Sequence, residues 1–237
     1  MKSLIPAKTN SQRVPDKNWR PFFGNYSLVD ILVQKLISCG SCVSDIYISC
    51  EDEDKLDEMH SRYGTSSVIR DRDLCDNSVS LTEWISRICS QIPDNDDIAW
   101  CQTCSPLWNE YSQCFHKWES VREDYDSLVV CHPFKGYLMT ENHQPVGWSF
   151  GKHHTPSQFL PKFTTMPFTL SIFSRESAVN TSYHVGSKPF WHESSGFNVD
   201  IDTMDDFQAA SRLFGFTEFA AKLRNTASID SNQTPML

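Results

Sequence analysis

The N-terminal stretch reads Ser3-Leu4-Ile5-Pro6-Ala7-Lys8-Thr9-Asn10-Ser11-Gln12-Arg13-Val14-Pro15-Asp16-Lys17-Asn18, and it decides the fold. Its first part, Ser3–Ala7, has the short apolar pattern of a buried strand. The loop that follows is basic and hydroxyl-bearing but does not match the glycine-rich P-loop pattern. We predict that Lys8, Arg13 and Lys17 supply charge, and Ser11 hydrogen bonds, to a polyphosphate at the carboxyl end of this strand. A solvated basic loop is the alternative interpretation.

Short apolar runs alternate with segments of helical spacing through the first half of the chain. Strands are expected at Ser3–Ala7, Asp45–Ser49, Ser67–Arg70, Ile98–Gln102 and Ser127–His132, and helices at Leu28–Ile37, Glu53–Tyr63, Leu81–Ile92 and Asn109–Val121. This order predicts parallel strands joined by crossover helices. Further strands are expected at Phe168–Phe173 and Phe197–Ile201, and a last helix runs from the N-cap Thr203 through Phe214.

The chain length of 237 residues fits one domain, which we place at residues 1–224. Residues 133–166, rich in Gly, Pro, His and aromatic residues, are too long for a plain loop and are predicted to be an insertion. From residue 225 to 237 the sequence is polar and aperiodic, so we expect a disordered tail there.

Composition narrows the class of protein. The chain has 21 Lys and Arg against 30 Asp and Glu, a formal net charge of −9, which disfavours a nucleic-acid binder. No apolar run is long enough to cross a membrane, and no signal peptide is recognisable, so we predict a cytoplasmic protein. The nine cysteines are expected to be free thiols. A zinc-stabilised binding module is a minor alternative, because the chain has two pairs with Cys-x-x-Cys spacing, Cys39/Cys42 and Cys101/Cys104.

Asp200-Ile201-Asp202 is the second candidate site. In a strand, side chains two residues apart point to the same face, so the two carboxylates are expected side by side. Two such carboxylates suit Mg²⁺, which takes oxygen ligands and usually keeps water and substrate phosphates. Alternatively, Asp202 is an ordinary capping residue before the last helix.

Five motifs in order resemble the acylneuraminate cytidylyltransferase family, the enzymes that make CMP-activated sialic acids. They are Pro6-Ala7-Lys8 with Ser11-Gln12 and Pro15-x-Lys17-Asn18; Ile46-Tyr47-Ile48-Ser49-Cys50-Glu51-Asp52; Tyr63-Gly64 with Val68-Ile69-Arg70 and Leu74-Cys75-Asp76; Gln102-Thr103-Cys104-Ser105-Pro106-Leu107; and Asp200-Ile201-Asp202-Thr203 with Asp206-Phe207. The resemblance covers roughly residues 2–216.

This resemblance implies a three-layer α/β/α, Rossmann-like, mostly parallel sheet of the nucleotide-diphospho-sugar transferase type, with residues 133–166 serving dimerisation and sugar contacts in a homodimer. The implied enzyme transfers CMP from CTP to the anomeric hydroxyl of an acidic nine-carbon, nonulosonic sugar and releases pyrophosphate. In this view Lys8 and Lys17 are catalytic together with the Mg²⁺ carboxylates Asp200 and Asp202. The nucleotide lies against Lys8, Ser11, Arg13, Lys17, Asn18 and Arg70, and the sugar against Gln102 and Lys135.

Some residues depart from the family pattern. Lys8 replaces an arginine and so lacks its bidentate fork, Gln12 replaces a lysine, and an arginine expected near Ser157-Gln158 to meet the sugar carboxylate is missing. These departures keep open a catalytically impaired nucleotide-binding homologue, and an enzyme for a different acidic sugar such as octulosonate. Gln102-Thr103-Cys104-Ser105-Pro106 argues against the octulosonate family, which carries an aspartate in this motif.

Overall fold

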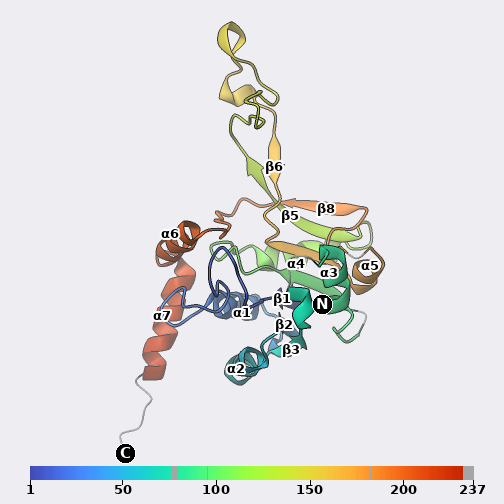
Figure 1. Ribbon diagram of the computed structural model, residues 1–237, viewed down its shortest axis with the longest axis vertical. Coiled ribbons are helices and arrows are strands. Elements are labelled where there is room, and N and C mark those ends of the chain that lie inside the picture. Colours follow the sequence, from blue (N-terminus) through green and yellow to red (C-terminus); the bar gives the residue numbers. More distant parts are fainter. Residues whose placement is uncertain (76–78, 95, 182, 232–237) are drawn as a thin grey trace, which may run out of the picture.

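An eight-stranded sheet lies at the centre of the protein (Figure 1). The computed structural model describes residues 1–75, 79–94, 96–181 and 183–231. The strand order is β3-β2-β1-β4-β7-β5-β6, and β8 pairs with β5. The strands are β1 (Lys2–Pro6), β2 (Ile46–Cys50), β3 (Ser66–Ile69), β4 (Asp97–Cys101), β5 (Ser127–Phe134), β6 (Phe163–Thr165), β7 (Leu170–Ser174) and β8 (Pro189–Glu193).

Most of these strands run in one direction. β1 pairs in parallel with β2 and β4, β2 pairs in parallel with β3, and β5 in parallel with β8. β7 is reversed, because it is antiparallel to both β4 and β5. The predicted mostly parallel sheet is therefore confirmed, with β7 antiparallel near its centre and β6, which is antiparallel to β5, at its edge.

Helices cover both faces of the sheet, because both faces are apolar. Alternate strand residues divide between two cores: Ile5 packs in the core that involves α1, α2 and α4, and Leu4 in the core that involves α3 and α5. These helices are α1 (Leu28–Ser38), α2 (Glu53–Tyr63), α3 (Leu81–Cys89), α4 (Tyr111–Val121) and α5 (Arg175–Thr181). The three-layer α/β/α architecture is thus confirmed.

Two C-terminal helices, α6 (Met204–Phe214) and α7 (Glu218–Ser231), pack beside α1 and the N-terminal loop. Thr203 caps α6 as predicted, in a capping box with Asp206. In the third core, Val14 and Phe22 of the N-terminal loop meet Phe207 and Phe214 of α6. Helix α6 therefore helps to fix the loop that was predicted to bind phosphate.

The structure contains three elements that the sequence pattern did not predict, α5, β6 and β8, and it differs from the prediction in two further segments. Residues 197–201 form no strand, since no neighbouring strand pairs with them. The segment predicted as a disordered tail begins as helix, because α7 continues past residue 225 to Ser231; residues 232–237 lie outside the described residues. Within the described part of the chain, none of the helices combines the length and the apolar character that a membrane span requires.

The predicted insertion stands away from the body of the protein (Figure 1). β5 leaves the sheet at its C-terminal end, where His132–Phe134 pairs with β6 to form the base. Residues 135–162 between these strands, called the arm from here on, hold two short 3-10 turns. An aromatic cluster stabilises the arm, in which Trp148 contacts Tyr137 and Phe150 edge to face.

Candidate active site

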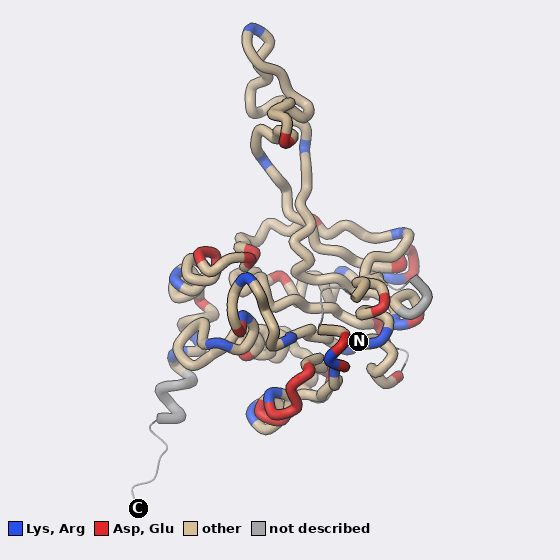
Figure 2. The backbone as a smooth tube through the Cα atoms, in the orientation of Figure 1, with Lys and Arg blue, Asp and Glu red and all other residues tan. Residues whose placement is uncertain are grey.

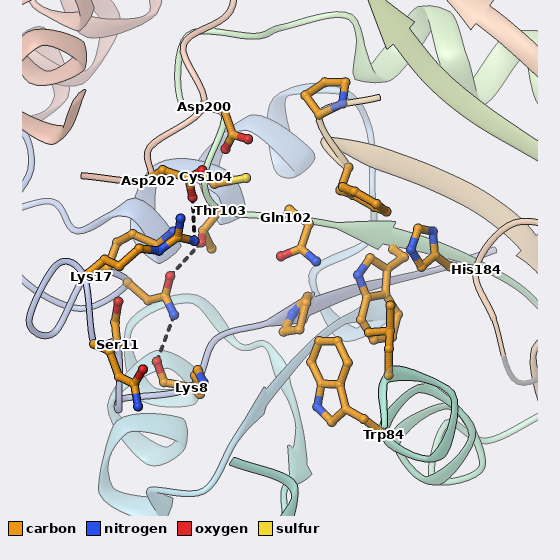
Figure 3. Close-up of a pocket in the computed structure, with 18 of the residues that line it drawn as sticks. Lys8, Ser11, Lys17, Trp84, Gln102, Thr103, Cys104, His184, Asp200 and Asp202 are labelled. Atoms are coloured by element: carbon orange, nitrogen blue, oxygen red, sulfur yellow. Dashed lines mark hydrogen bonds and ion pairs between the residues drawn. The ribbon is translucent and has the colours of Figure 1, made fainter. Parts of the chain in front are cut away.

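A cavity of about 520 Å³ opens where several parallel strands end. Pro6 ends β1, Arg70 follows β3 and Gln102 follows β4, and all three line the cavity. Figure 3 shows Asp200, Asp202 and Cys104 at one end, Trp84 and His184 at the other, and Gln102 between them. The carboxyl ends of parallel strands are where open α/β sheets bind ligands.

The basic loop lines the polar end of this cavity. Lys8, Ser11, Gln12, Arg13 and Lys17 all contribute to its wall. Lys17 Nζ donates to the carbonyl oxygen of Ile201 at 2.8 Å, and Arg13 Nη2 lies 2.7 Å from Asp202 Oδ1. Cationic and carboxylate groups from opposite ends of the chain thus meet in one site.

Asn18 ties this loop to the end of β4. Its Nδ2 donates to the carbonyl oxygen of Lys8 at 2.8 Å, and its Oδ1 accepts from Thr103 Oγ1 at 2.7 Å. Both Asn18 and Thr103 are buried. Although Asn18 lines the cavity, both ends of its amide are used in holding the loop, so it shapes the pocket by fixing the backbone of Lys8.

Asp200 and Asp202 flank Ile201, whose backbone is hydrogen-bonded at both its N–H and its carbonyl. Ile201 N donates to the carbonyl oxygen of Cys104 at 3.0 Å, while the Ile201 carbonyl accepts from Lys17. Both carboxylates line the cavity. Burial raises the pKa of Asp200 even though its side chain is open to the cavity, and the negative charge of Asp202 raises it further. A bound cation would relieve this repulsion between the two carboxylates.

The other end of the cavity is aromatic. Trp84 of α3 and Trp100 of β4 meet edge to face, with ring centroids 5.0 Å apart, and Trp100 stacks on His184. Burial lowers the pKa of His184 to about 4, so this imidazole is neutral at pH 7. Neither indole N–H has a hydrogen-bond partner within the described residues. This end therefore presents aromatic side chains, while both indole N–H groups are buried without a partner among the described residues.

Arg70 connects the two ends. Its guanidinium lies 5.0 Å from the ring centroid of Trp84, and its Nη2 donates to the Ser49 carbonyl at 3.2 Å. The side chain is buried, and desolvation lowers its pKa. A buried cation held in place by an aromatic ring and a carbonyl is suited to orient a nucleotide without moving.

The structure brings most of the predicted site residues together. Nine of them line the cavity: Lys8, Ser11, Arg13, Lys17, Asn18, Arg70, Gln102, Asp200 and Asp202. Lys135 does not line it, because this residue is exposed at the start of the arm. Within a single copy of the chain, Lys135 therefore lies apart from the other predicted site residues, and its contact with the sugar stays a prediction.

Sequence reasoning missed the aromatic wall formed by Trp84, Trp100, Phe168 and His184. Trp100 could have been found, since it lies two positions before Gln102 and so points to the same side of the extended chain. Trp84 and His184 come from a helix and from a loop before β8, and no local pattern joins them.

The donor set is suited to Mg²⁺ and not to zinc. Asp200 and Asp202 supply two hard oxygen ligands beside a cationic loop, which fits an ion whose remaining ligands are phosphates and water. All nine cysteines are free. In the parts of the chain that the structure describes, no three His, Cys, Asp or Glu side chains gather as a metal site, so neither Cys-x-x-Cys pair forms a zinc centre there.

Comparison with known proteins supports the resemblance seen in the motifs. A family model described as cytidylyltransferase matches residues 3–112. A pseudaminic acid cytidylyltransferase of Campylobacter jejuni is 22% identical over 236 residues, covering 89% of this chain and 94% of that protein.

Two solved structures share the fold. One is a CMP:2-keto-3-deoxy-manno-octonic acid synthetase complexed with CTP, with a TM-score of 0.63 and 11% identity over 90% of this chain and 98% of the other. The second is a putative glucose-1-phosphate thymidylyltransferase from Bacillus anthracis, with a TM-score of 0.63 and 14% identity over 92% and 96% of the two chains. The predicted resemblance to the cytidylyltransferases and the predicted fold are confirmed.

Proposed function

We propose that this chain, which resembles the cytidylyltransferases in sequence and fold, is a nucleotidyltransferase that transfers CMP from CTP to an acidic nine-carbon sugar. The proposal rests on one observation: the basic loop, Arg70 and the carboxylates of Asp200 and Asp202 all line the same cavity. The relative of this chain in Campylobacter jejuni is named for pseudaminic acid, which favours a nonulosonic acid as the acceptor.

In the proposed reaction the anomeric hydroxyl of the sugar attacks the α-phosphorus of CTP. The new bond joins the sugar oxygen to phosphorus, the bond from phosphorus to the bridging oxygen breaks, and pyrophosphate leaves while the hydroxyl proton passes to solvent. Since the protein forms no covalent bond in this step, its contribution is to position the reactants and to stabilise charge. Lys8, Ser11 and Lys17 are placed to hold the triphosphate.

A Mg²⁺ ion held by Asp200 and Asp202 would neutralise charge on the phosphates during the transfer. Lys17 keeps these carboxylates near the loop through its bond to the Ile201 carbonyl. The aromatic wall lines the other end, and Gln102 lies between the two ends, where the anomeric centre would have to reach the phosphate.

We also propose that the enzyme works as a homodimer in the cytoplasm. The arm exposes large apolar side chains, with Phe150 58% and Phe159 72% accessible, and it stands away from the rest of the described chain. Figure 2 shows Lys and Arg positions on the arm; it holds three lysines and one glutamate in a chain whose net charge is −9. A second copy that covers the arm could bring Lys135 to an acidic sugar.

The test is pyrophosphate release from CTP and Mg²⁺ with a panel of nonulosonic acids and with octulosonate, alongside ATP, GTP and UTP. We expect release with CTP and a nonulosonic acid. Release with octulosonate alone would instead assign the other acidic sugar. CTP binding without release from any sugar would identify a nucleotide-binding homologue that has lost turnover.

A further inference from the structure

Arg13 and Asp202 form an ion pair within the candidate active site. Arg13 Nη2 lies 2.7 Å from Asp202 Oδ1, and the two side chains are 67% and 49% accessible. Both residues line the cavity. The carboxylate that was assigned to the metal is therefore already bound by a cation from the protein itself.

The charge of Arg13 reaches the other carboxylates of this segment as well. Its positive charge acts on Asp200 and on Asp206 in addition to its ion pair with Asp202. Lys17 also faces Asp200, but its ammonium group donates to the Ile201 carbonyl. The guanidinium of Arg13 thus offsets part of the repulsion between the carboxylates of Asp200 and Asp202.

An arginine and a divalent cation compete for one carboxylate oxygen, because their positive charges repel each other at that distance. The pair of Arg13 and Asp202 is well exposed, and exposed ion pairs contribute little to stability. A divalent cation can therefore displace Arg13 at small cost.

Once displaced, the guanidinium of Arg13 could bind a phosphate group of a nucleotide in the cavity. Arg13 belongs to the loop that holds Lys8, Ser11 and Lys17 at the cavity, and its neighbour Gln12 carries no charge. The planar fork of an arginine binds phosphate oxygens in bidentate fashion, which a lysine does not. An incoming triphosphate would offer Arg13 stronger acceptors than the exposed carboxylate.

We propose that Arg13 is a positioning residue that holds Asp202 in the metal-free protein, gives it up to the divalent cation, and then binds a phosphate of the nucleotide. This inference rests on the proposed function, since it assumes that a metal and a nucleoside triphosphate share the cavity. This exchange makes the binding of metal and nucleotide cooperative, because each ligand favours the state in which the ion pair of Arg13 and Asp202 is broken.

The test uses Mn²⁺ as a probe and the full chain without nucleotide. In Arg13→Ala, Mn²⁺ affinity measured by calorimetry or electron paramagnetic resonance is expected to rise about two- to fivefold, because the competing pair is gone. The affinity of the same variant for CTP with Mg²⁺ is expected to fall about tenfold or more, because a charge-assisted phosphate contact is lost. Opposite changes in the two affinities are the signature of the exchange.

Arg212→Ala is the matched control, since it removes the same charge from an exposed position on α6 outside the cavity. Neither affinity should change in this variant. Arg13→Lys keeps the charge without the fork, so its CTP affinity should lie between those of wild type and Arg13→Ala. Thermal unfolding checks that Arg13→Ala folds as the wild type does.

Unchanged or weaker Mn²⁺ binding in Arg13→Ala would overturn the inference, as would the absence of Mn²⁺ binding from both proteins with and without CTP. If the wild type releases pyrophosphate but Arg13→Ala shows no opposite changes, the proposed function stands and this inference fails. If the opposite changes occur but no sugar is used, the inference stands and the proposed acceptor is wrong.

Discussion

Replacing Asn18 with alanine tests whether the phosphate-binding loop is fixed by one buried amide. The substitution removes the bonds to the Lys8 carbonyl and the Thr103 hydroxyl, at 2.8 and 2.7 Å. Leaving a buried polar group without a partner costs about 1–3 kcal/mol. With two groups affected, we expect Asn18→Ala to lose roughly 2–5 kcal/mol of unfolding free energy.

Thermal and urea unfolding measure this loss directly. For a domain of this size, each kcal/mol lowers the melting temperature by roughly 2–4 °C, so the expected decrease is roughly 4–20 °C. The KM for CTP should also rise, because the Lys8 backbone is no longer held. Asn10→Ala, an exposed asparagine of the same loop, is the control and should melt close to the wild type.

A double-mutant cycle with Thr103→Val separates the two bonds. In the Thr103→Val background, Asn18→Ala removes only the Lys8 contact, so we expect a coupling energy of about 1 kcal/mol between the two positions. A decrease in melting temperature below about 2 °C for Asn18→Ala, or additive effects in the cycle, would refute the reasoning.

Three further predictions concern pH and assembly. Burial lowers the pKa of Lys35 from 10.5 to about 7. Between pH 7 and pH 10.5 the unfolded chain therefore binds more protons than the folded one, so the unfolding free energy of the wild type should rise with pH. Urea titrations of Lys35→Met should show a flatter dependence of the unfolding free energy on pH. Burial lowers the pKa of His184 from 6.5 to about 4, so stability should fall as the pH drops through this range, and His184→Gln should lose that acid-dependent part of the unfolding free energy. If a second copy covers the arm, the Phe150→Ser/Phe159→Ser variant should sediment as a monomer where the wild type sediments as a dimer; identical sedimentation of the two would contradict this.

The sequence predicts the β-α-β part of the fold well, because each strand there is a short apolar run and each helix has a clear apolar face. It fails at residues 197–201, where an apolar pattern resembles a strand but no neighbour pairs with it. Asp200 and Asp202 still line the cavity, and hydrogen bonds at both the N–H and the carbonyl of Ile201 hold this segment in place. The prediction of two adjacent carboxylates thus holds for a different structural reason.

The aromatic end of the cavity could not be predicted in the same way. Trp84, Trp100 and His184 meet only after α3, β4 and the segment before β8 are packed together. Taken separately, each has the pattern of an ordinary core residue. For Lys135 the resemblance predicts a contact with the sugar, whereas in a single chain this residue is exposed on the arm.

The central claim is that Asp200 and Asp202 bind the divalent cation of a CTP-dependent transfer. The most direct measurement is the rate of pyrophosphate release from CTP and an accepted nonulosonic acid, for the wild type and for Asp200→Asn/Asp202→Asn, across a Mg²⁺ titration. We predict that the double variant loses roughly a thousandfold or more in rate, since charge stabilisation by the metal is worth several kcal/mol. Unchanged release by the double variant at the same Mg²⁺ concentration would contradict the account.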